Sequence, residues 1–460
     1  MKQSKKLVSM LVVLAVVLVA TVFVLTYEEK KEEIKNSGET ILQIAKDDVT
    51  GIAWKNENNE LSFSKEEKWV YDGDDAFPVD ADKLTALLHS FEELNASFEI
   101  ENVDHYGQYG LENPEYSITL DTKDKTYEIR LGDFSSMDSE RYISIGDGSV
   151  YLVADDPAED FDIALDDLME HDVIPEIEDA TELAFTGMEN YSICLEETSI
   201  TYDEEDLYYA DRNGKKEAVD SEKIEAYLNT IKNLSLTNYK TYAAEEGDLE
   251  EYGLNNPELT ITVKNREEDE DGEMPIETFS ISVGRNPEEV EKAEEEEEVP
   301  AYVRVGESNI IYEITFTEYE SLTASSYNDL CHQQIFWADF SSVTELTVGL
   351  EGEEYTFLAS GKSDDRVYKY KDKEIEMDEV KSSLLGMTVE EFTNDSTEGK
   401  EEIRLTIELD NENVSSVEMK FYRHDGSTCL AVVDGENLAF VSREHVVDLI
   451  EAVNAVVLNN

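Results

Sequence analysis

Histidine, cysteine and carboxylate side chains are the groups of this sequence that could do chemistry. Imidazole serves both metal binding and acid–base catalysis. No two of them have the H-x-x-x-H spacing that places two imidazoles on one face of a helix. The six are His89, His105, His171, His332, His424 and His445. A metal site would need distant segments to converge, so we expect each histidine to lie at the surface or at a helix end.

The three cysteines, Cys194, Cys331 and Cys429, are odd in number and contain no C-x-x-C pair. This pattern gives neither a disulfide framework nor a zinc site. Unpaired cysteine usually behaves as a small apolar residue. We therefore expect buried free thiols.

No motif for a nucleophile or a phosphate accompanies these residues. The sequence has no G-x-S-x-G elbow, no Walker loop and no G-x-G-x-x-G fingerprint. Among 109 acidic residues, no carboxylate pair for glycosidase chemistry can be singled out. We expect no catalytic residue, no cofactor and no metal ion, and hence a protein that is not an enzyme.

Acidic residues dominate the composition. With 37 basic residues against the 109 acidic ones, the formal net charge is −72, which disfavours nucleic acid and anionic lipid as partners. Two acidic tracts, from Glu267 to Pro275 and from Glu288 to Glu298, are expected to be solvated loops. Calcium binding is the alternative for them, but neither has the D-x-D-x-D-G loop with a terminal Glu. Hydrophobic residues still make up 40% of the chain, which indicates folded domains with a negative surface.

One seven-residue motif occurs twice and shows how the chain is built. Six of its seven positions agree, and each copy leads into an alternating apolar strand. Glycine allows a positive φ and proline suits the start of a strand, so the motif is interpreted as a structural turn. Its candidate residues are Tyr109, Gly110, Leu111, Asn113 and Pro114 in the first copy, and Tyr252, Gly253, Leu254, Asn256 and Pro257 in the second.

Three tandem units are predicted from recurring openings. Similar strands begin at Val49, Ala180 and Val343, and each unit later has an aspartate that could cap a helix, namely Asp80, Asp220 and Asp378. The alternating apolar residues indicate antiparallel strands, and helices with apolar faces must pack on the sheets, so the fold class is α+β. We place the units at residues 47–176, 177–337 and 338–460. The third lacks the motif and is abbreviated.

The N-terminal 27 residues are predicted to be a cytoplasmic tip and a transmembrane anchor. The run from Leu7 to Leu25 is apolar, carries no charge and is long enough to cross a bilayer as a helix. No A-x-A-like cleavage site follows it, so the anchor should remain uncleaved. Lysines precede it and an acidic stretch follows from Glu28, which places the N-terminus in the cytoplasm and the bulk of the chain outside the cell. Residues 28–46 should form a helical stalk.

The anchor, the recurring strand openings and the Tyr-Gly-Leu-x-Asn-Pro turn together resemble the domain-of-unknown-function 4340 family (DUF4340). The resemblance is carried by Tyr109 to Pro114 and Tyr252 to Pro257, and it covers the first two units. It implies a bacterial, membrane-anchored protein whose gene lies near those of gliding-motility-type ABC transporters. It carries over no catalytic residue.

We therefore expect a non-enzymatic, extracytoplasmic accessory or binding protein on the cell membrane. Its partners would be the membrane subunits of an ABC-type export system or a cell-surface polymer. Tandem repeats suit such a function because they build a long surface. Two alternatives remain, a cell-envelope hydrolase with a site between repeats and a structural spacer without a ligand.

Overall fold

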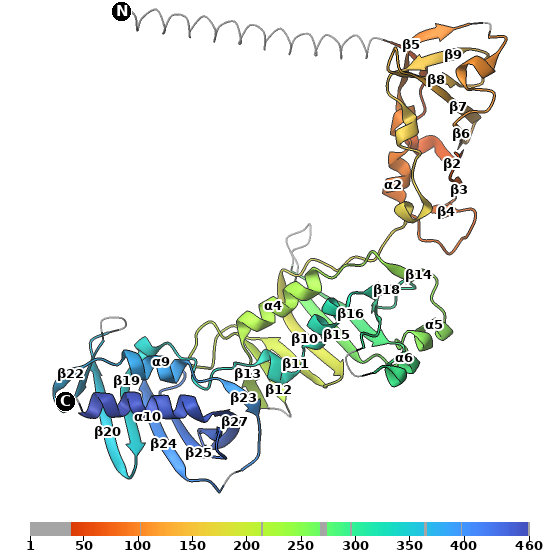
Figure 1. The fold of residues 1–460 in the computed structure, drawn as a ribbon. Helices are drawn as coiled ribbons and strands as arrows, with labels where there is room; N and C mark the ends of the chain where they lie inside the picture. Colours follow the sequence, from red (N-terminus) through yellow and green to blue (C-terminus); the bar gives the residue numbers. More distant parts are fainter. Residues whose placement is uncertain are drawn as a thin grey trace, which may run out of the picture. The chain divides into compact units, whose positions relative to one another are not determined.

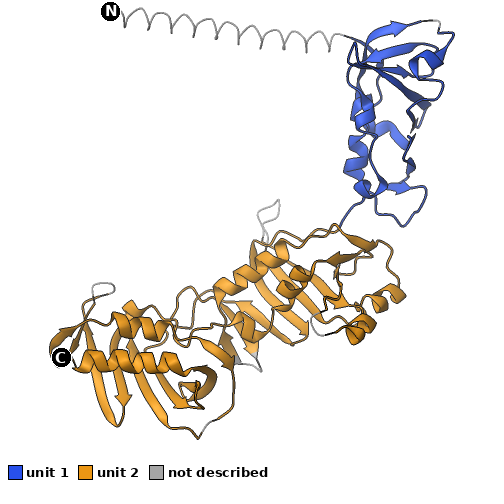
Figure 2. Cartoon of the chain, in the orientation of Figure 1, with its two compact units in different colours: residues 1–171 blue, residues 172–460 orange. Residues whose placement is uncertain are grey.

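Three antiparallel sheets of nine strands each follow one another along the chain (Figure 1). The computed structural model describes residues 38–458 except 102, 213–214, 267–273, 295–296, 363–365 and 397. The described residues fall into two compact units (Figure 2). One ends at His171 and holds the first sheet; the other begins at Asp172 and holds the second and third.

The first sheet has the strand order β1-β5-β9-β8-β7-β6-β2-β3-β4. Its strands are β1 (Glu39–Leu42), β2 (Val49–Lys55), β3 (Glu60–Lys65), β4 (Trp69–Tyr71), β5 (Leu94–Ile100), β6 (Tyr116–Thr122), β7 (Thr126–Ser135), β8 (Glu140–Ser144) and β9 (Val150–Val153). The helices are α2 (Ala81–Ala86) and α3 (His89–Glu92), with 3-10 turns at Lys46–Asp48, Tyr106–Tyr109, Pro157–Glu159 and Leu165–Leu168.

The second sheet has the order β13-β12-β11-β10-β15-β16-β17-β18-β14. Its strands are β10 (Asp179–Gly187), β11 (Tyr191–Leu195), β12 (Tyr208–Arg212), β13 (Lys215–Ala218), β14 (Tyr239–Thr241), β15 (Leu259–Arg266), β16 (Ile276–Arg285), β17 (Ala301–Val305) and β18 (Ile311–Ile314). The helices are α4 (Ser221–Lys232), α5 (Glu246–Glu251), α6 (Pro287–Lys292), α7 (Phe316–Thr323) and α8 (Tyr327–Leu330).

The third sheet has the order β22-β21-β20-β19-β24-β25-β26-β27-β23. Its strands are β19 (Val343–Leu350), β20 (Glu353–Ser360), β21 (Val367–Tyr370), β22 (Lys373–Ile375), β23 (Val389–Phe392), β24 (Glu401–Leu409), β25 (Ser416–Arg423), β26 (Thr428–Val433) and β27 (Glu436–Ser442). Its helices are α9 (Asp378–Leu385) and α10 (Arg443–Leu458), and a 3-10 turn at Phe340–Ser342 precedes it.

The three sheets repeat one topology. From β4, β12 or β21 to β5, β14 or β23, the order of corresponding strands is the same; β14 and β23 lie at the edges of their sheets, whereas β1 lies beyond β5. The register is also the same, since the cross-strand pairs Ile118–Ile129, Ile261–Ile281 and Leu405–Met419 occupy equivalent places. The third unit keeps this order although it lacks the sequence motif. The structure therefore has α+β architecture with tandem sheets.

A shared bulge explains the recurring strand openings. The register shifts after Val49, Ala180 and Val343, which are the first or second residues of β2, β10 and β19. The next residue is a threonine in every case, and its hydroxyl donates to a carbonyl of the neighbouring strand at 3.3, 3.1 and 3.1 Å, in chain order. A bulge interrupts the ladder, so a side chain that bonds across it secures the pairing there.

Helices cover one face of each sheet, as Figure 1 shows for α10 on the third. The side chains that they cover include Phe357 and Phe421, which are fully buried with Val446 and Leu449 of α10. Asp80 and Asp220 cap helices as predicted, because their carboxylates accept backbone N–H groups of the first turn. Asp378 does not; it is the first residue of α9, and Met377 occupies the N-cap position.

Two predictions about the rest of the chain need correction. Residues 38–46 were expected to belong to a helical stalk, but Glu39–Leu42 forms β1, which pairs with β5. The edge of a sheet offers unpaired backbone groups, and this pairing outweighs the weak helical pattern. The acidic tract after Arg285 is not all loop either, since Asn286 caps α6 over Pro287–Lys292.

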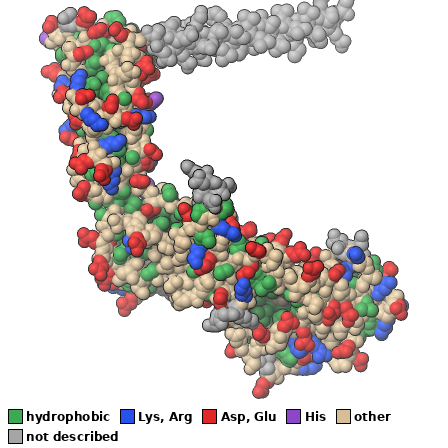
Figure 3. Space-filling view, turned by 180° about the vertical axis from the view of Figure 1, so that it is seen from behind, with side chains coloured by type: hydrophobic (Ala, Val, Ile, Leu, Met, Phe, Trp, Pro, Cys, Tyr) green, Lys and Arg blue, Asp and Glu red, His purple; other side chains and the backbone are tan. Residues whose placement is uncertain are grey.

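The anchor predicted at residues 7–25 lies outside the described residues, and among those described no helix is long and apolar enough to span a membrane. The thiols are free, with Cys331 and Cys429 buried and Cys194 half-buried. Burial raises the pKa of the Cys429 thiol to about 12, so this thiol stays protonated at neutral pH. Carboxylates are scattered over the face shown in Figure 3, with lysine and arginine between them.

Candidate functional site

The repeated motif forms the same turn in the first and second sheets. In the first copy Gly110, with a φ of 71°, ends the 3-10 turn Tyr106–Tyr109; in the second, Gly253 has a φ of 70° and follows α5. A positive φ strains any residue with a side chain, which accounts for glycine at this position. Each turn then leads into a central strand, β6 or β15.

A second glycine lets each turn lie directly on the sheet. A Cβ atom at Gly132 in β7 would stand 2.1 Å from the carbonyl oxygen of Tyr109, and one at Gly284 in β16 would stand 2.6 Å from that of Gly253. Both distances are too short for any side chain. The two glycines thus permit the backbone of the turn to contact the backbone of a strand.

Aromatic and apolar side chains pack beside the turn. Tyr109 lies 5.0 Å from the ring of Tyr142, and Tyr252 lies 4.5 Å from the equivalent Tyr302. Leu111 and Leu254 are buried, and Pro114 and Pro257 are half-buried. The second copy forms a small apolar cluster of its own from Leu254, Tyr302 and Ile311. The remaining predicted residues, Asn113 and Asn256, are exposed.

The glutamate that ends the motif was not singled out from sequence, yet it forms an ion pair with an arginine in each copy. Glu115 accepts a hydrogen bond from Nη1 of Arg141 at 2.6 Å. Arg141 is 7% exposed and also donates to Asp156 through Nε, at 2.8 and 2.7 Å, and to the carbonyl of Gly132 at 2.7 Å. Burial opposes the charge on Arg141, but the hydrogen bonds to the two carboxylates outweigh it and raise the pKa of the guanidinium.

The second copy pairs its glutamate with a different strand. Glu258 accepts from Nε of Arg285 at 3.1 and 3.3 Å and from the hydroxyl of Tyr319 at 2.7 Å. The guanidinium of Arg285 lies 4.5 Å from the ring centroid of Tyr319. Burial and the neighbouring Glu258 raise the pKa of the Tyr319 phenol, so it remains a donor. Arg285 is the last residue of β16, whereas Arg141 lies in β8. The equivalent glutamates are therefore paired with arginines from strands that do not correspond.

These contacts occupy the charged side chains of the motif. Each glutamate is neutralised by an arginine, and each arginine has its carboxylate or carbonyl acceptors in place. The arrangement can hold a turn against a strand, and it presents no nucleophile with an adjacent base. A signal was available in the sequence, because Glu115 and Glu258 follow proline in both copies.

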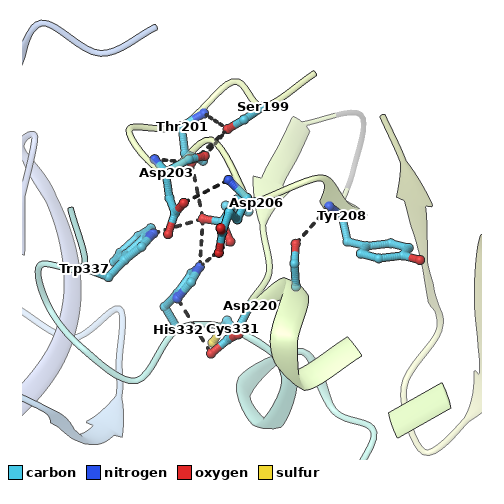
Figure 4. Close-up of polar contacts among 12 residues, drawn as sticks. Ser199, Thr201, Asp203, Asp206, Tyr208, Asp220, Cys331, His332 and Trp337 are labelled. Atoms are coloured by element: carbon cyan, nitrogen blue, oxygen red, sulfur yellow. Dashed lines mark hydrogen bonds and ion pairs between the residues drawn. The ribbon is translucent and has the colours of Figure 1, made fainter. Parts of the chain in front are cut away.

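The second grouping of titratable side chains lies between the second and third sheets, within one compact unit (Figure 4). Asp206 is 2% exposed, and both its oxygens lie 2.9 Å from Nε2 of His332. The indole of Trp337 donates to the same carboxylate at 3.0 Å, and Thr201 donates to it at 3.3 Å. On the other side of the imidazole, Nδ1 of His332 stands 3.7 Å from Asp220.

Of the two places expected for a histidine, the surface and a helix end, His332 is not at the surface; it directly follows Cys331, the C-cap residue of α8. Its side chain is 10% exposed, and its ring stacks on Trp337 with centroids 4.3 Å apart and an angle of 12°. His332 is far from both Asp206 and Asp220 in the sequence, so no spacing could reveal the grouping. An aspartate and a histidine in contact are also part of many catalytic sites, but here the carboxylate is saturated by donors and closed to solvent.

Two further observations bear on chemistry. Among the described residues, no group of three or more histidine, cysteine or carboxylate side chains could hold a metal ion. A depression of about 570 Å³ lies between α9 and α10, and its lining combines carboxylates with serine and alanine. The lining residues are Asp378, Glu379, Ser382, Ser383, Asp448, Glu451, Ala452 and Ala455. None of them is a base or nucleophile activated by a neighbour.

Comparison with protein families identifies one that is described as "Domain of unknown function (DUF4340)". Its pattern matches twice, over residues 69–243 and 213–406, so the two matches together span more than two thirds of the chain. This confirms the resemblance drawn from the Tyr-Gly-Leu-x-Asn-Pro turns, and it extends the similarity into the third sheet. No curated protein and no solved structure matches the chain.

Proposed function

The chain belongs to the DUF4340 family, and we propose that it is a non-enzymatic accessory protein of the bacterial cell membrane. In this proposal residues 7–25 anchor it, the N-terminus is cytoplasmic, and the three sheets stand outside the cell. The sheets bind a partner, which would be a membrane subunit of an ABC-type export system or a polymer of the cell surface.

The observation that carries the proposal is the tandem repetition of one sheet. The three sheets share one order of corresponding strands. Proteins built from stacked copies of one unit commonly use the extended surface for binding. Asp206, in the loop between β11 and β12 of the second sheet, moreover contacts His332 and Trp337 of the segment that leads to the third sheet.

The charge of the surface restricts the partner. A formal net charge of −72 repels anionic polymers and lipids, and it attracts cationic segments or surfaces that carry metal ions. Membrane proteins concentrate lysine and arginine on their cytoplasmic side. A partner on the outer side would therefore contribute local cationic patches rather than a uniformly basic surface.

The hydrolase alternative places a catalytic site between repeats. The grouping of Asp206, Asp220 and His332 stands at such a position, but its carboxylate accepts from three donors and has no room for a substrate. A general base must be able to reach the proton that it removes. We therefore propose binding rather than hydrolysis.

The test is a pull-down from detergent-solubilised membranes of the native host. Three versions of the protein serve as bait: the full chain, the chain without residues 1–27, and a chain in which residues 7–25 are replaced by an unrelated apolar segment of equal length. The last is the matched control, because it keeps the membrane attachment and changes only the sequence of the anchor.

We expect transporter subunits to copurify with the full chain and with the version that carries the replaced anchor. Loss of the subunits only on replacement would assign the contact to the anchor helix. If no transporter subunit copurifies with the full chain, the proposed partnership is contradicted. Envelope polymers would then be tested as ligands with the chain that lacks residues 1–27.

A further inference from the structure

The second and third sheets are connected by more than the chain that joins them. Residues 199–206, here called the clasp loop, leave the second sheet after β11 and reach the third. We propose that the clasp loop locks these two sheets into a single rigid body, so that they move and bind as one platform. This inference does not depend on the identity of the partner.

The clasp loop is first fixed to its own sheet. The hydroxyl of Tyr209, in β12, accepts from the backbone N–H of Ile200 at 2.8 Å and donates to the carbonyl of Asp206 at 2.6 Å. Tyr209 is 1% exposed. The hydroxyl of Ser199 also donates to the carbonyl of Asp203. The loop thus has a defined shape before any contact with the third sheet is considered.

The third sheet is hydrogen-bonded to the clasp loop through two asparagines in the turn between β24 and β25. Asn411 donates to the carbonyl of Tyr202 at 3.0 Å, and Asn413 donates to the carbonyls of Ser199 and Thr201 at 3.0 and 3.1 Å. Asn411 also accepts from the backbone N–H of Asn413 at 2.9 Å, which holds the turn in the shape that these bonds need. Such preorganisation reduces the entropy lost when the contact forms.

The segment that connects the two sheets also contacts the clasp loop. His332 and Trp337 belong to this segment, and both contact the buried carboxylate of Asp206 (Figure 4). The ring of Tyr202 lies 4.8 Å from that of Trp337 and packs against the core of the third sheet. Directional hydrogen bonds to a buried charge combined with aromatic packing favour one geometry over its neighbours.

Hydrogen bonds hold this connection at both ends. On the side of the second sheet, Lys223 of α4 donates to the carbonyls of Asp329 and Cys331 at 2.8 and 2.9 Å. On the side of the third, Gln334 bridges to Thr388, and the N–H of Ile335 donates to the carbonyl of Met387 at 3.0 Å. A connection bonded to α4 at one end and to the residues before β23 at the other cannot act as a flexible linker, which is the default expectation between domains.

The test measures the distance between the two sheets in the full chain. Spin labels are placed on cysteines introduced at Glu225 in α4 and Glu444 in α10, which are both exposed. The half-buried Cys194 is first changed to serine, so that it takes no label. Pulsed electron paramagnetic resonance then gives the distribution of the distance between the labels.

The lock predicts a narrow distribution in the otherwise native protein. Asp206→Asn and Trp337→Phe should each give a roughly twofold broader distribution, because domains without a large fixed interface move relative to one another. Trp337→Phe keeps an aromatic ring at the position and removes only the indole donor, so it separates loss of the lock from loss of folding. The exposed Asp395, changed to asparagine, is the matched control and should leave the width unchanged.

A distribution that is already broad in the native protein would overturn the proposal. It would also be overturned if Asp206→Asn and Trp337→Phe, combined in a chain that still folds, left the width unaltered. Neither result would bear on whether a transporter subunit copurifies, so failure of the lock and failure of the proposed function are distinguishable.

Discussion

The second and third sheets differ at one equivalent position, which lies in β16 of the second sheet and in β25 of the third. In the second, Gly284 pairs with Tyr302 across the strands and leaves space for the Tyr-Gly-Leu turn. In the third, the equivalent residue of the register is Tyr422, which pairs with Leu430. The second sheet thus has glycine at the position where the turn packs, whereas the third sheet, among its described residues, has no such turn and carries a tyrosine at the equivalent position.

The difference follows from the length of the connection that enters the central strand. Between β14 and β15 lie 17 residues, which include α5 and the motif, whereas only eight separate β23 from β24. Eight extended residues span roughly 26 Å, enough to pass four strand spacings of about 4.8 Å each. The shorter connection suffices for the topology, so the motif is a covering element rather than a requirement of the fold.

The largest effect expected from this comparison is at Gly284. Gly284→Ala places a Cβ atom 2.6 Å from the carbonyl oxygen of Gly253 and forces the turn away from β16. We expect the free energy of unfolding of the unit that contains it to fall by about 3 kcal/mol. Urea denaturation followed by circular dichroism measures this change.

Gly349 in β19 of the third sheet is the matched control for that substitution. The three atoms nearest to a Cβ atom there all belong to the side chain of Arg404, and the closest are guanidinium nitrogens at 3.2 Å. Gly349→Ala should be neutral or stabilising within about 1 kcal/mol. If Gly284→Ala and Gly349→Ala lowered the free energy of unfolding equally, the turn would make no contribution to the effect at Gly284.

A smaller effect is expected at the glutamate of the motif. Glu258→Gln weakens the contacts with Arg285 and Tyr319, which are partly buried, and should lower the free energy of unfolding by about 1 to 2 kcal/mol. The third sheet offers an exposed pair for comparison, Arg404 with Glu354 at 3.3 Å. Glu354→Gln should cost less than about 1 kcal/mol. The same denaturation experiment, run on both variants, would contradict the comparison if Glu354→Gln proved the more destabilising.

The smallest effect concerns the hairpin between β25 and β26, which replaces the longer connection that carries α6 in the second sheet. Backbone N–H groups of Ser427 and Thr428 donate to Asp425 and lower the pKa of its carboxyl to about 2. A carboxyl whose pKa is lowered by folding stabilises the fold above its unfolded pKa, near 3.8. That contribution is lost as the pH falls towards 2.

Unfolding by urea at pH 5 and at pH 2.5 measures this dependence. The native chain should be more stable than Asp425→Asn at pH 5. The difference should shrink at pH 2.5, because this pH lies below the unfolded pKa of the carboxyl and most of the stability gained from its lowered pKa is lost there. A difference that stays constant between the two values would show that the ionised carboxylate does not hold the hairpin.

Local patterns in the sequence were sufficient for much of the fold. Alternating apolar residues predicted the strands, and the openings at Val49, Ala180 and Val343 mark the first long strand of each sheet. The turn at Gly110 and Gly253 followed from glycine and proline chemistry. These features depend on neighbours along the chain. The strand β1 was missed because its pairing with β5 joins residues more than fifty positions apart.

The sequence by itself determined the number of repeats, the antiparallel strands and the turn that two of the repeats share, because each depends on residues close together in the chain. Only the tertiary structure decided that Asp206 meets His332 and Trp337, and that Glu115 and Glu258 draw their arginines from different strands. Contacts of this kind form when distant segments are brought together by the burial of apolar surface. They leave no period or spacing in one sequence from which they could be predicted.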